Sequence, residues 1–281
     1  MGAPPPVERR FVSTECGRIH VALCGAGLPV LLLHQTPRSL DEYRDVLPLL
    51  GGRVQAVAMD TPGFGESERL AGPPTIEAWA EAAFATLDAL GIGWAVLAGH
   101  HTGAVIATEM AASRPERAAA LVLSSCSLVD AARRAAHAGK PVIDAVERHS
   151  DGRHLTELWS RRAPFYPRER PDLLERYVAD ALRAGPLAAA GHQVVNAYRM
   201  EDRIGRVACP TLVIDAAMDP HAHPAAARVA AAIPQARLHV IADGMVPLPD
   251  QLPGPFADAI LHFLDDASLL TPKESLSWTR T

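Results

Sequence analysis

Residues 96–107, which read VLAGHHTGAVIA, decide the fold. The apolar run at their start predicts a buried strand, and the pattern that follows, over residues 102–113, is typical of a helix. Gly99 and Gly103 give the strand and the helix room to pack closely across a tight turn. His101, at the apex of this turn, is therefore expected in a strained conformation with its side chain aimed at the edge of a sheet.

Short apolar runs of the kind expected for strands buried on both faces recur along the chain. They lie at residues 30–33, 54–59, 95–98, 120–123, 211–214 and 238–241. Helical patterns alternate with them, at residues 40–50, 76–90, 102–113, 224–232 and 256–264. Two further strands, at residues 10–14 and 18–24, are expected to form an antiparallel hairpin at the start. The alternation predicts a mostly parallel eight-stranded sheet with helices on both faces.

This alternation stops between residues 127 and 207, where no buried strand is predicted. The segment is rich in Arg, Ala, His and aromatic residues and is expected to form several helices, inserted as a cap. An insert at the carboxyl edge of a parallel sheet covers the crevice where ligands bind. The predicted organisation is a core of residues 1–126 and 208–268, a helical cap at 127–207, and a loose tail at 269–281.

Composition narrows the range of partners. Of the 281 residues, 48% are hydrophobic and 21% are charged, which is typical of a globular protein. The net charge of −5 indicates no basic surface, so nucleic acid is not an expected partner. There is no run of about 18 apolar residues and no apolar signal-peptide region, so no membrane association is expected. The four scattered cysteines form no C-x-x-C pair, which favours the reducing cytoplasm.

Several motifs occur in an order that is known from one family. The turn at His101 matches G-x-S-x-G except at its central residue. Residues 34–37 (HQTP) resemble an H-G-x-P loop, and residues 60–67 (DTPGFGES) closely match D-x-x-G-x-G-x-S. Asp219 follows a predicted strand at the position of a catalytic acid. Together these motifs resemble the α/β-hydrolase superfamily over nearly the whole chain, which implies an α/β-hydrolase fold with a helical cap.

The chain departs from this family at two positions of the catalytic triad. His101 stands where the nucleophile is expected, and Met245 stands where the catalytic histidine is expected after the last strand. Of the triad, only the acid, Asp219, is retained. The resemblance therefore does not carry over a serine-esterase mechanism.

The altered site nevertheless suggests a catalytic arrangement. The imidazole of His101 is longer than a serine side chain, and we expect it to contact Asp219 directly. One ring nitrogen would then be fixed as a donor, and the other would serve as a general base or acid. The resemblance places oxyanion donors at the backbone N–H groups of Gln35 and Thr102. These features predict a cofactor-independent enzyme that hydrolyses a small ester, lactone or thioester, with His101 as base.

Other functions remain open on the sequence alone. His101 could instead transfer a proton in a lyase, decarboxylase, isomerase or cyclase, or form a labile acyl-imidazole. A non-catalytic protein that binds a small molecule is a further alternative, with His101 merely filling the pocket. His34, His221 and His223 raise the possibility of a metal-dependent hydrolase, but their spacing matches no metal-ligand signature, so no metal is expected.

The remaining expected pocket residues surround this site. His221 or His223 could substitute for the missing catalytic histidine. His100 is expected to point away from the crevice and to have a structural role. The full set of expected pocket residues is His34, His221, His223, Met245, Trp159, Phe165 and Tyr166. Met245 is expected as an apolar wall and the aromatic residues as a lid. The expected assembly is a monomer or a homodimer.

Overall fold

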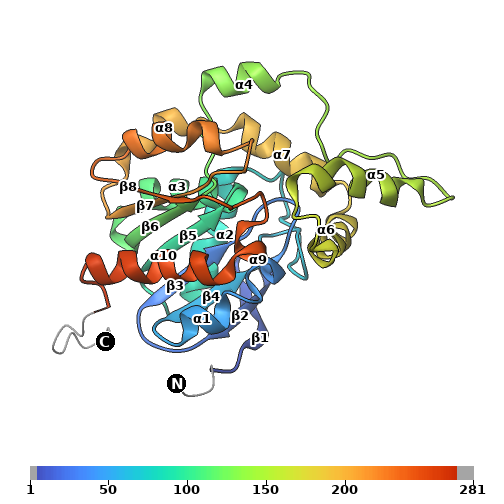
Figure 1. The fold of residues 1–281 in the computed structure, drawn as a ribbon. Coiled ribbons are helices and arrows are strands. Elements are labelled where there is room, and N and C mark those ends of the chain that lie inside the picture. The colour runs from blue at the N-terminus through green and yellow to red at the C-terminus, as the bar shows by residue number, and fades with distance from the viewer. Residues whose placement is uncertain (1–4, 271–281) are drawn as a thin grey trace.

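A single sheet of eight strands forms the centre of the molecule in the computed structural model, which describes residues 5–270 (Figure 1). Across the sheet the strands follow the order β1-β2-β4-β3-β5-β6-β7-β8. β2 runs antiparallel to β1 and β4, and all other neighbours are parallel. The predicted sheet and its initial hairpin are thus confirmed. The strands are β1 (Glu8–Thr14), β2 (Gly17–Cys24), β3 (Pro29–Leu33), β4 (Gln55–Met59), β5 (Ala95–His100), β6 (Ala118–Ser124), β7 (Thr211–Ala216) and β8 (Arg237–Ile241).

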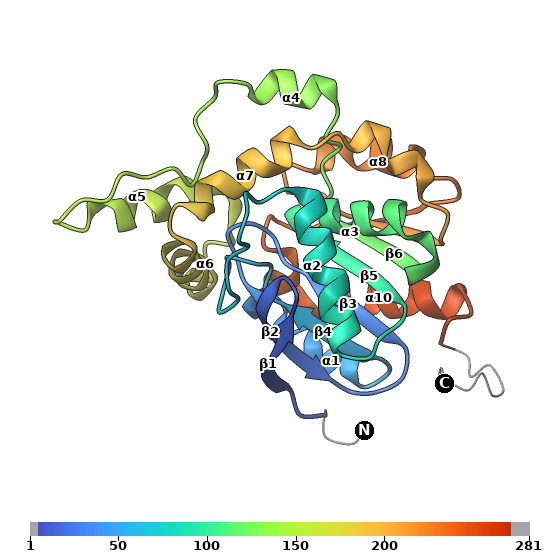
Figure 2. The ribbon, with the colours of Figure 1, turned by 180° about the vertical axis from the view of Figure 1, so that it is seen from behind.

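Side chains of the strands alternate between two hydrophobic cores, one on each face of the sheet. In β3, Leu31 and Leu33 belong to the core beneath α2, α3 and α8, whereas Val30 and Leu32 belong to the core beneath α1 and α10. Figure 2 shows α2 and α3 in front of the sheet and α10 behind it. The predicted helices on both faces are therefore present. They are α1 (Leu47–Gly51), α2 (Ile76–Ala89), α3 (Thr102–Ser113), α8 (Ala226–Ala231) and α10 (Pro253–Asp266).

The single helix predicted at residues 40–50 is wrong, because the segment is broken in the middle. A 3-10 helix, Leu40–Tyr43, is followed by α1, which begins at Leu47. Pro48 lies in the first turn of α1. A proline in a helix interior clashes with the carbonyl group four residues earlier, whereas at a helix start its missing N–H has no cost. The break therefore places Pro48 where a helix tolerates it.

Between β6 and β7 the described chain forms helices and no strand, and we call residues 127–207 the helical insert. Arg38 joins the insert to the core: its guanidinium donates to Asp180 on α6 at 2.9 Å and to Asp250 on α9 (Leu248–Gln251) at 2.5 Å. Removing one partner of a buried ion pair leaves an uncompensated charge, so these contacts fix how the insert docks. The predicted tail at 269–281 lies largely outside the described residues. The helices of the insert are α4 (Ala131–His137), α5 (Arg153–Arg162), α6 (Pro171–Ala184) and α7 (Leu187–Ala197).

The turn between β5 and α3 is tight because two glycines let the backbones approach. A Cβ atom on Gly103 would lie 1.8 Å from the carbonyl oxygen of Leu33, and one on Gly99 would lie 2.1 Å from the backbone of Gly103. His101, between them, has φ 47° and ψ −109°. A conformation of this kind costs about 1–3 kcal/mol and persists only where the surrounding packing enforces it. The backbone of His101 is therefore held in place by the packing of α3 on β3.

Replacement of the second glycine tests this packing. Gly103→Ala is expected to lower the free energy of unfolding by about 3 kcal/mol, because the added methyl group meets backbone rather than a flexible side chain. Urea denaturation of the purified variant measures the change. Gly205→Ala is the matched control, since no atom lies within 4 Å of its added Cβ. Equal stability losses in the two variants would contradict the close approach of α3 to β3.

Candidate active site

His101 and Asp219 meet at the carboxyl edge of the sheet. β5 ends just before His101, and Asp219 lies in the loop after β7. The His101 Nε2 atom lies 2.9 Å from the Asp219 Oδ2 atom; the His101 side chain is 16% exposed and the Asp219 side chain 0%. The ring N–H is not aligned with this oxygen, so the pair is in contact without a well-directed hydrogen bond. The expected direct contact of His101 with Asp219 is therefore present.

Asp219 is held as a carboxylate by its surroundings. Burial opposes its charge, but His101 and the backbone N–H of His221, which donates to Oδ1 at 2.9 Å, outweigh that effect. These interactions keep the pKa of the Asp219 carboxyl well below its usual range. A negative charge thus lies permanently beside the ring of His101.

His100 is bonded within the interior, as expected for a structural residue. Its Nε2 atom lies 2.8 Å from the carbonyl oxygen of Val246 and must donate to it, so Nδ1 accepts from the Ser124 hydroxyl at 2.9 Å. Burial, with the neighbouring His101 ring, lowers the pKa of His100 to about 3. The neutral imidazole therefore connects the loop after β8 to the end of β5, next to His101.

A cavity of about 710 Å³ opens between the sheet edge and the helical insert. This volume lies within the range of small-molecule sites. The core contributes Gln35, Thr36, His101, Thr102, His221 and Val246 to its wall, and the insert contributes Arg133, Lys140, Arg162, His192 and Asn196. The second ring nitrogen of His101, Nδ1, has no hydrogen-bond partner among residues 5–270. One nitrogen of His101 thus lies against Asp219 and the other is available to a ligand.

The expectation that Gln35 supplies an oxyanion donor is wrong. Its backbone N–H donates to the Glu42 carboxyl at 2.9 Å, and its side-chain amide donates to the same group at 2.6 Å. Burial raises the pKa of Glu42 to about 8. The next N–H along the loop, that of Thr36, is also occupied, because it donates to the Thr102 hydroxyl at 3.2 Å. Thr102 begins α3, and its own N–H has no partner within the described chain. Of these three backbone donors, only the N–H of Thr102 is therefore free beside His101.

The other histidines of the expected pocket separate into two groups. His221 lines the cavity, and its ring packs on Phe165 with 4.6 Å between ring centroids. His34 does not face the cavity, because its ring accepts the Thr61 N–H at 2.9 Å and donates to a backbone carbonyl at 2.8 Å. His223 lies at the surface with a 49% exposed side chain and binds Asp215 at 2.9 Å. Only His221 of these three joins His101 at the cavity.

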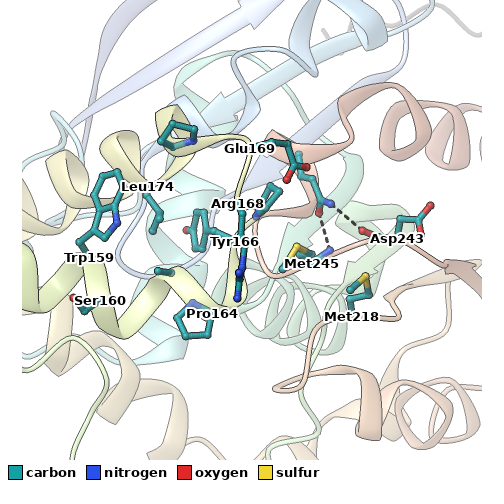
Figure 3. Close-up of a pocket in the computed structure, with 14 residues that line it drawn as sticks. Trp159, Ser160, Pro164, Tyr166, Arg168, Glu169, Leu174, Met218, Asp243 and Met245 are labelled. Carbon is teal, nitrogen blue, oxygen red and sulfur yellow. Dashed lines mark hydrogen bonds between the residues drawn. The ribbon is translucent and has the colours of Figure 1, made fainter.

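Met245, Trp159 and Tyr166 line a different hollow, an outer groove of about 890 Å³ (Figure 3). The backbone N–H of Met245 donates to the Gln251 side chain at 2.7 Å, which fixes the loop so that Val246, one residue later, lies in the cavity of His101. The expectation that Met245 forms a wall beside His101 is therefore wrong by one residue. Trp159 and Tyr166 likewise belong to the outer groove and not to a lid over His101.

A family model described as the alpha/beta hydrolase fold matches residues 29–245, and the chain therefore belongs to this family. It is 35% identical over 121 residues to haloalkane dehalogenase 2 of Mycobacterium tuberculosis, covering 43% of this chain and 42% of the relative. It is 34% identical over 130 residues to 2-hydroxymuconate semialdehyde hydrolase of a Pseudomonas species, covering 44% and 46%. The chain thus spans less than half the length of these curated relatives.

Solved structures resemble the chain over most of its length. An esterase from Thermogutta terrifontis has a TM-score of 0.77 and 27% identity, covering 92% of this chain and 98% of that one. An enol-lactonase from Burkholderia xenovorans has a TM-score of 0.75 and 20% identity, covering 91% and 100%, which shows a common fold. The homologues are hydrolases, and this supports an enzymatic role. Within residues 5–270, no helix is long and apolar enough to cross a membrane.

The buried His100 predicts a specific acid sensitivity. Between pH 6.5 and about 3 the unfolded chain binds a proton at this residue that the folded chain does not, so the wild-type protein loses stability as the pH falls. His100→Asn is expected to reduce this slope by up to about 1.4 kcal/mol per pH unit. Urea denaturation over a series of acidic buffers measures the slope. His262→Asn, which removes an exposed imidazole, is the control; an unchanged slope in His100→Asn would contradict the prediction.

Proposed function

We propose that the protein hydrolyses small esters, lactones or thioesters, with His101 as the general base and Asp219 as the residue that positions it. The 2.9 Å contact between His101 and Asp219 at the apex of the turn carries this proposal. It leaves Nδ1 of His101 unpaired on the wall of a cavity that is large enough for a small substrate. A base in such a position accepts a proton from water within the same cavity.

The proposed reaction begins with the substrate carbonyl oxygen near the N–H group of Thr102, which has no partner in the described chain. A water molecule attacks the carbonyl carbon while Nδ1 of His101 takes its proton, and the carbonyl π electrons move to oxygen. The backbone N–H of Thr102 stabilises this oxyanion by about 3 kcal/mol, as one donor does in comparable sites. Asp219 stabilises the imidazolium. Collapse of the intermediate breaks the bond to the leaving oxygen or sulfur, which takes the proton from His101, and yields a carboxylic acid and an alcohol or thiol.

A water-based reaction fits the identity of the residue at the apex. A histidine there offers no hydroxyl, thiol or carboxylate for a stable covalent intermediate, and an acyl-imidazole is labile. The Thermogutta terrifontis esterase and the Burkholderia xenovorans enol-lactonase, whose folds resemble this chain, support carbonyl compounds as substrates. The four unpaired cysteines are consistent with a cytoplasmic location, which we include in the proposal.

Proton transfer at carbon is a second candidate, because His101 beside the backbone N–H of Thr102 also suits removal of a proton next to a carbonyl group. The resulting enolate would occupy the same position as the tetrahedral oxyanion. A lyase, isomerase, decarboxylase or cyclase of this kind would consume no water. Incorporation of solvent oxygen into the product therefore distinguishes hydrolysis from proton transfer at carbon.

Turnover of a metal-free panel of esters, lactones and thioesters tests the proposed hydrolysis. His101→Asn is expected to lower kcat by at least about 100-fold, because general-base catalysis is worth about 10²–10⁴-fold. Asparagine tolerates the positive φ of this position, so the fold is retained. His239→Asn, which removes an exposed histidine on β8, is the control and is expected to keep full activity.

Equal rates in wild type and His101→Asn would contradict hydrolysis by His101. In that case, exchange of solvent deuterium into carbonyl compounds would test the second candidate directly. Exchange that depends on His101 would support proton transfer at carbon, and its absence would leave a non-catalytic binding protein as the function.

A further inference from the structure

The cavity wall carries an excess of positive charge. Arg133, Arg134, Lys140 and Arg162 all line it, and no Asp or Glu stands among the described residues of its wall. A cavity bounded by charge of one sign and by low-dielectric walls concentrates ligands of the opposite sign. Only a cation that is not already paired within the protein can bind such a ligand.

Most of the cavity's guanidinium groups are already neutralised. Arg162 donates to Asp144 at 2.9 and 2.5 Å. Arg134 donates to Glu201 at 2.9 Å. These arginines hold the insert together and have little capacity left for a ligand. Lys140 lies on an exposed stretch, where water screens its charge.

Arg133, on α4, is different. Its Nε atom is buried and has no hydrogen-bond partner in the described chain, and its guanidinium takes part in no ion pair there. The nearest acidic residue in sequence, Asp130, accepts the backbone N–H of Arg133 at 2.8 Å and binds Arg228 at 2.5 Å. Burial lowers the pKa of Arg133, with only partial compensation from its neighbours. A partly buried, unpaired guanidinium is costly unless a ligand supplies the opposite charge.

The position of Arg133 relates it to the catalytic pair. It is close enough to interact electrostatically with Asp219 and His221, which lie at the sheet edge. Arg133 belongs to the part of the cavity wall that the insert contributes, because α4 lies in the insert, which extends above the sheet (Figure 1). Asn196, on α7, adds a buried side-chain oxygen that also has no partner among the described residues. The insert side of the cavity thus offers a cation and a hydrogen-bond acceptor.

We propose that the substrate carries a carboxylate, which Arg133 binds on the insert side of the cavity while the reacting carbonyl group lies over His101. The planar guanidinium matches a carboxylate with two parallel hydrogen bonds. One unpaired arginine suits one negative charge, so the substrate class is a small monoanionic acid that bears a second carbonyl group. This inference deepens the proposed function and rests on it for the orientation of the substrate.

Binding of an unreactive pair of ligands tests the inference without any turnover. Levulinate carries a carboxylate and a ketone, and levulinamide has the same shape without the charge. Isothermal titration is expected to give a Kd for levulinate at least about tenfold lower than for levulinamide, because a charge-assisted hydrogen bond strengthens binding by about that factor. Arg133→Gln is expected to abolish the preference, and Arg133→Lys to restore part of it. Arg199→Gln, which removes an exposed arginine of the insert that binds Asp202, is the matched control and keeps the preference.

Several results would overturn the inference: equal binding of the two ligands, no binding of levulinate to the wild type, tighter binding of inorganic phosphate, or a preference that survives in Arg133→Gln. The partial recovery in Arg133→Lys, with unchanged circular dichroism, separates loss of the charge from loss of the fold. The test is also independent of catalysis. Preference for levulinate in both wild type and His101→Asn, without turnover of any ester, would reject the proposed hydrolysis and retain the carboxylate site.

Discussion

The contact between the ring of His101 and the carboxylate of Asp219 depends on a positive φ at His101, a backbone conformation that residues other than glycine rarely adopt. A residue other than glycine at a positive φ is held there only by its surroundings, and here Gly103 lets α3 press against β3 closely enough to enforce it. In other proteins with this turn, the same geometry presents a serine to a catalytic histidine from a later part of the chain. With a histidine at the apex, the ring spans the distance to the acid alone.

The charged groups around this contact determine the rest of the site. Asp219 is fully buried, and its negative charge is stabilised by the contact with His101 and by the backbone N–H of His221. The insert is attached to the core by an ionic network around Arg38, in which each buried charge has a partner. Arg133, on the insert side of the cavity wall, lacks such a partner in the described chain. A cavity lined by an unpaired cation and by an acid–base pair is the arrangement expected for a site that binds an anion and moves a proton.

The sequence predicted a mostly parallel eight-stranded sheet and the succession of strands and helices along the chain. It also predicted that His101 meets Asp219, because parallel strands bring their carboxyl ends to one edge. It failed where side chains several residues beyond a motif decide the outcome. Glu42, seven residues after Gln35, folds back to occupy its N–H. The direction of Val246 into the cavity depends on a turn that is held by Gln251, six residues after Met245. The sequence does not identify Arg133 as a site residue. The docking of the insert on the core determines which face of α4 lies toward the cavity, and no local pattern predicts that docking.

Nitrogen NMR of histidine-labelled protein can determine whether Asp219 fixes one nitrogen of His101 and leaves the other free. The His101 signals are assigned by their loss in His101→Asn. In mildly alkaline solution we expect a proton on Nε2, toward Asp219, and none on Nδ1, and we expect Asp219→Asn to disturb this preference. A neutral ring with its proton on Nδ1, or a ring unaffected by Asp219→Asn, would contradict this expectation.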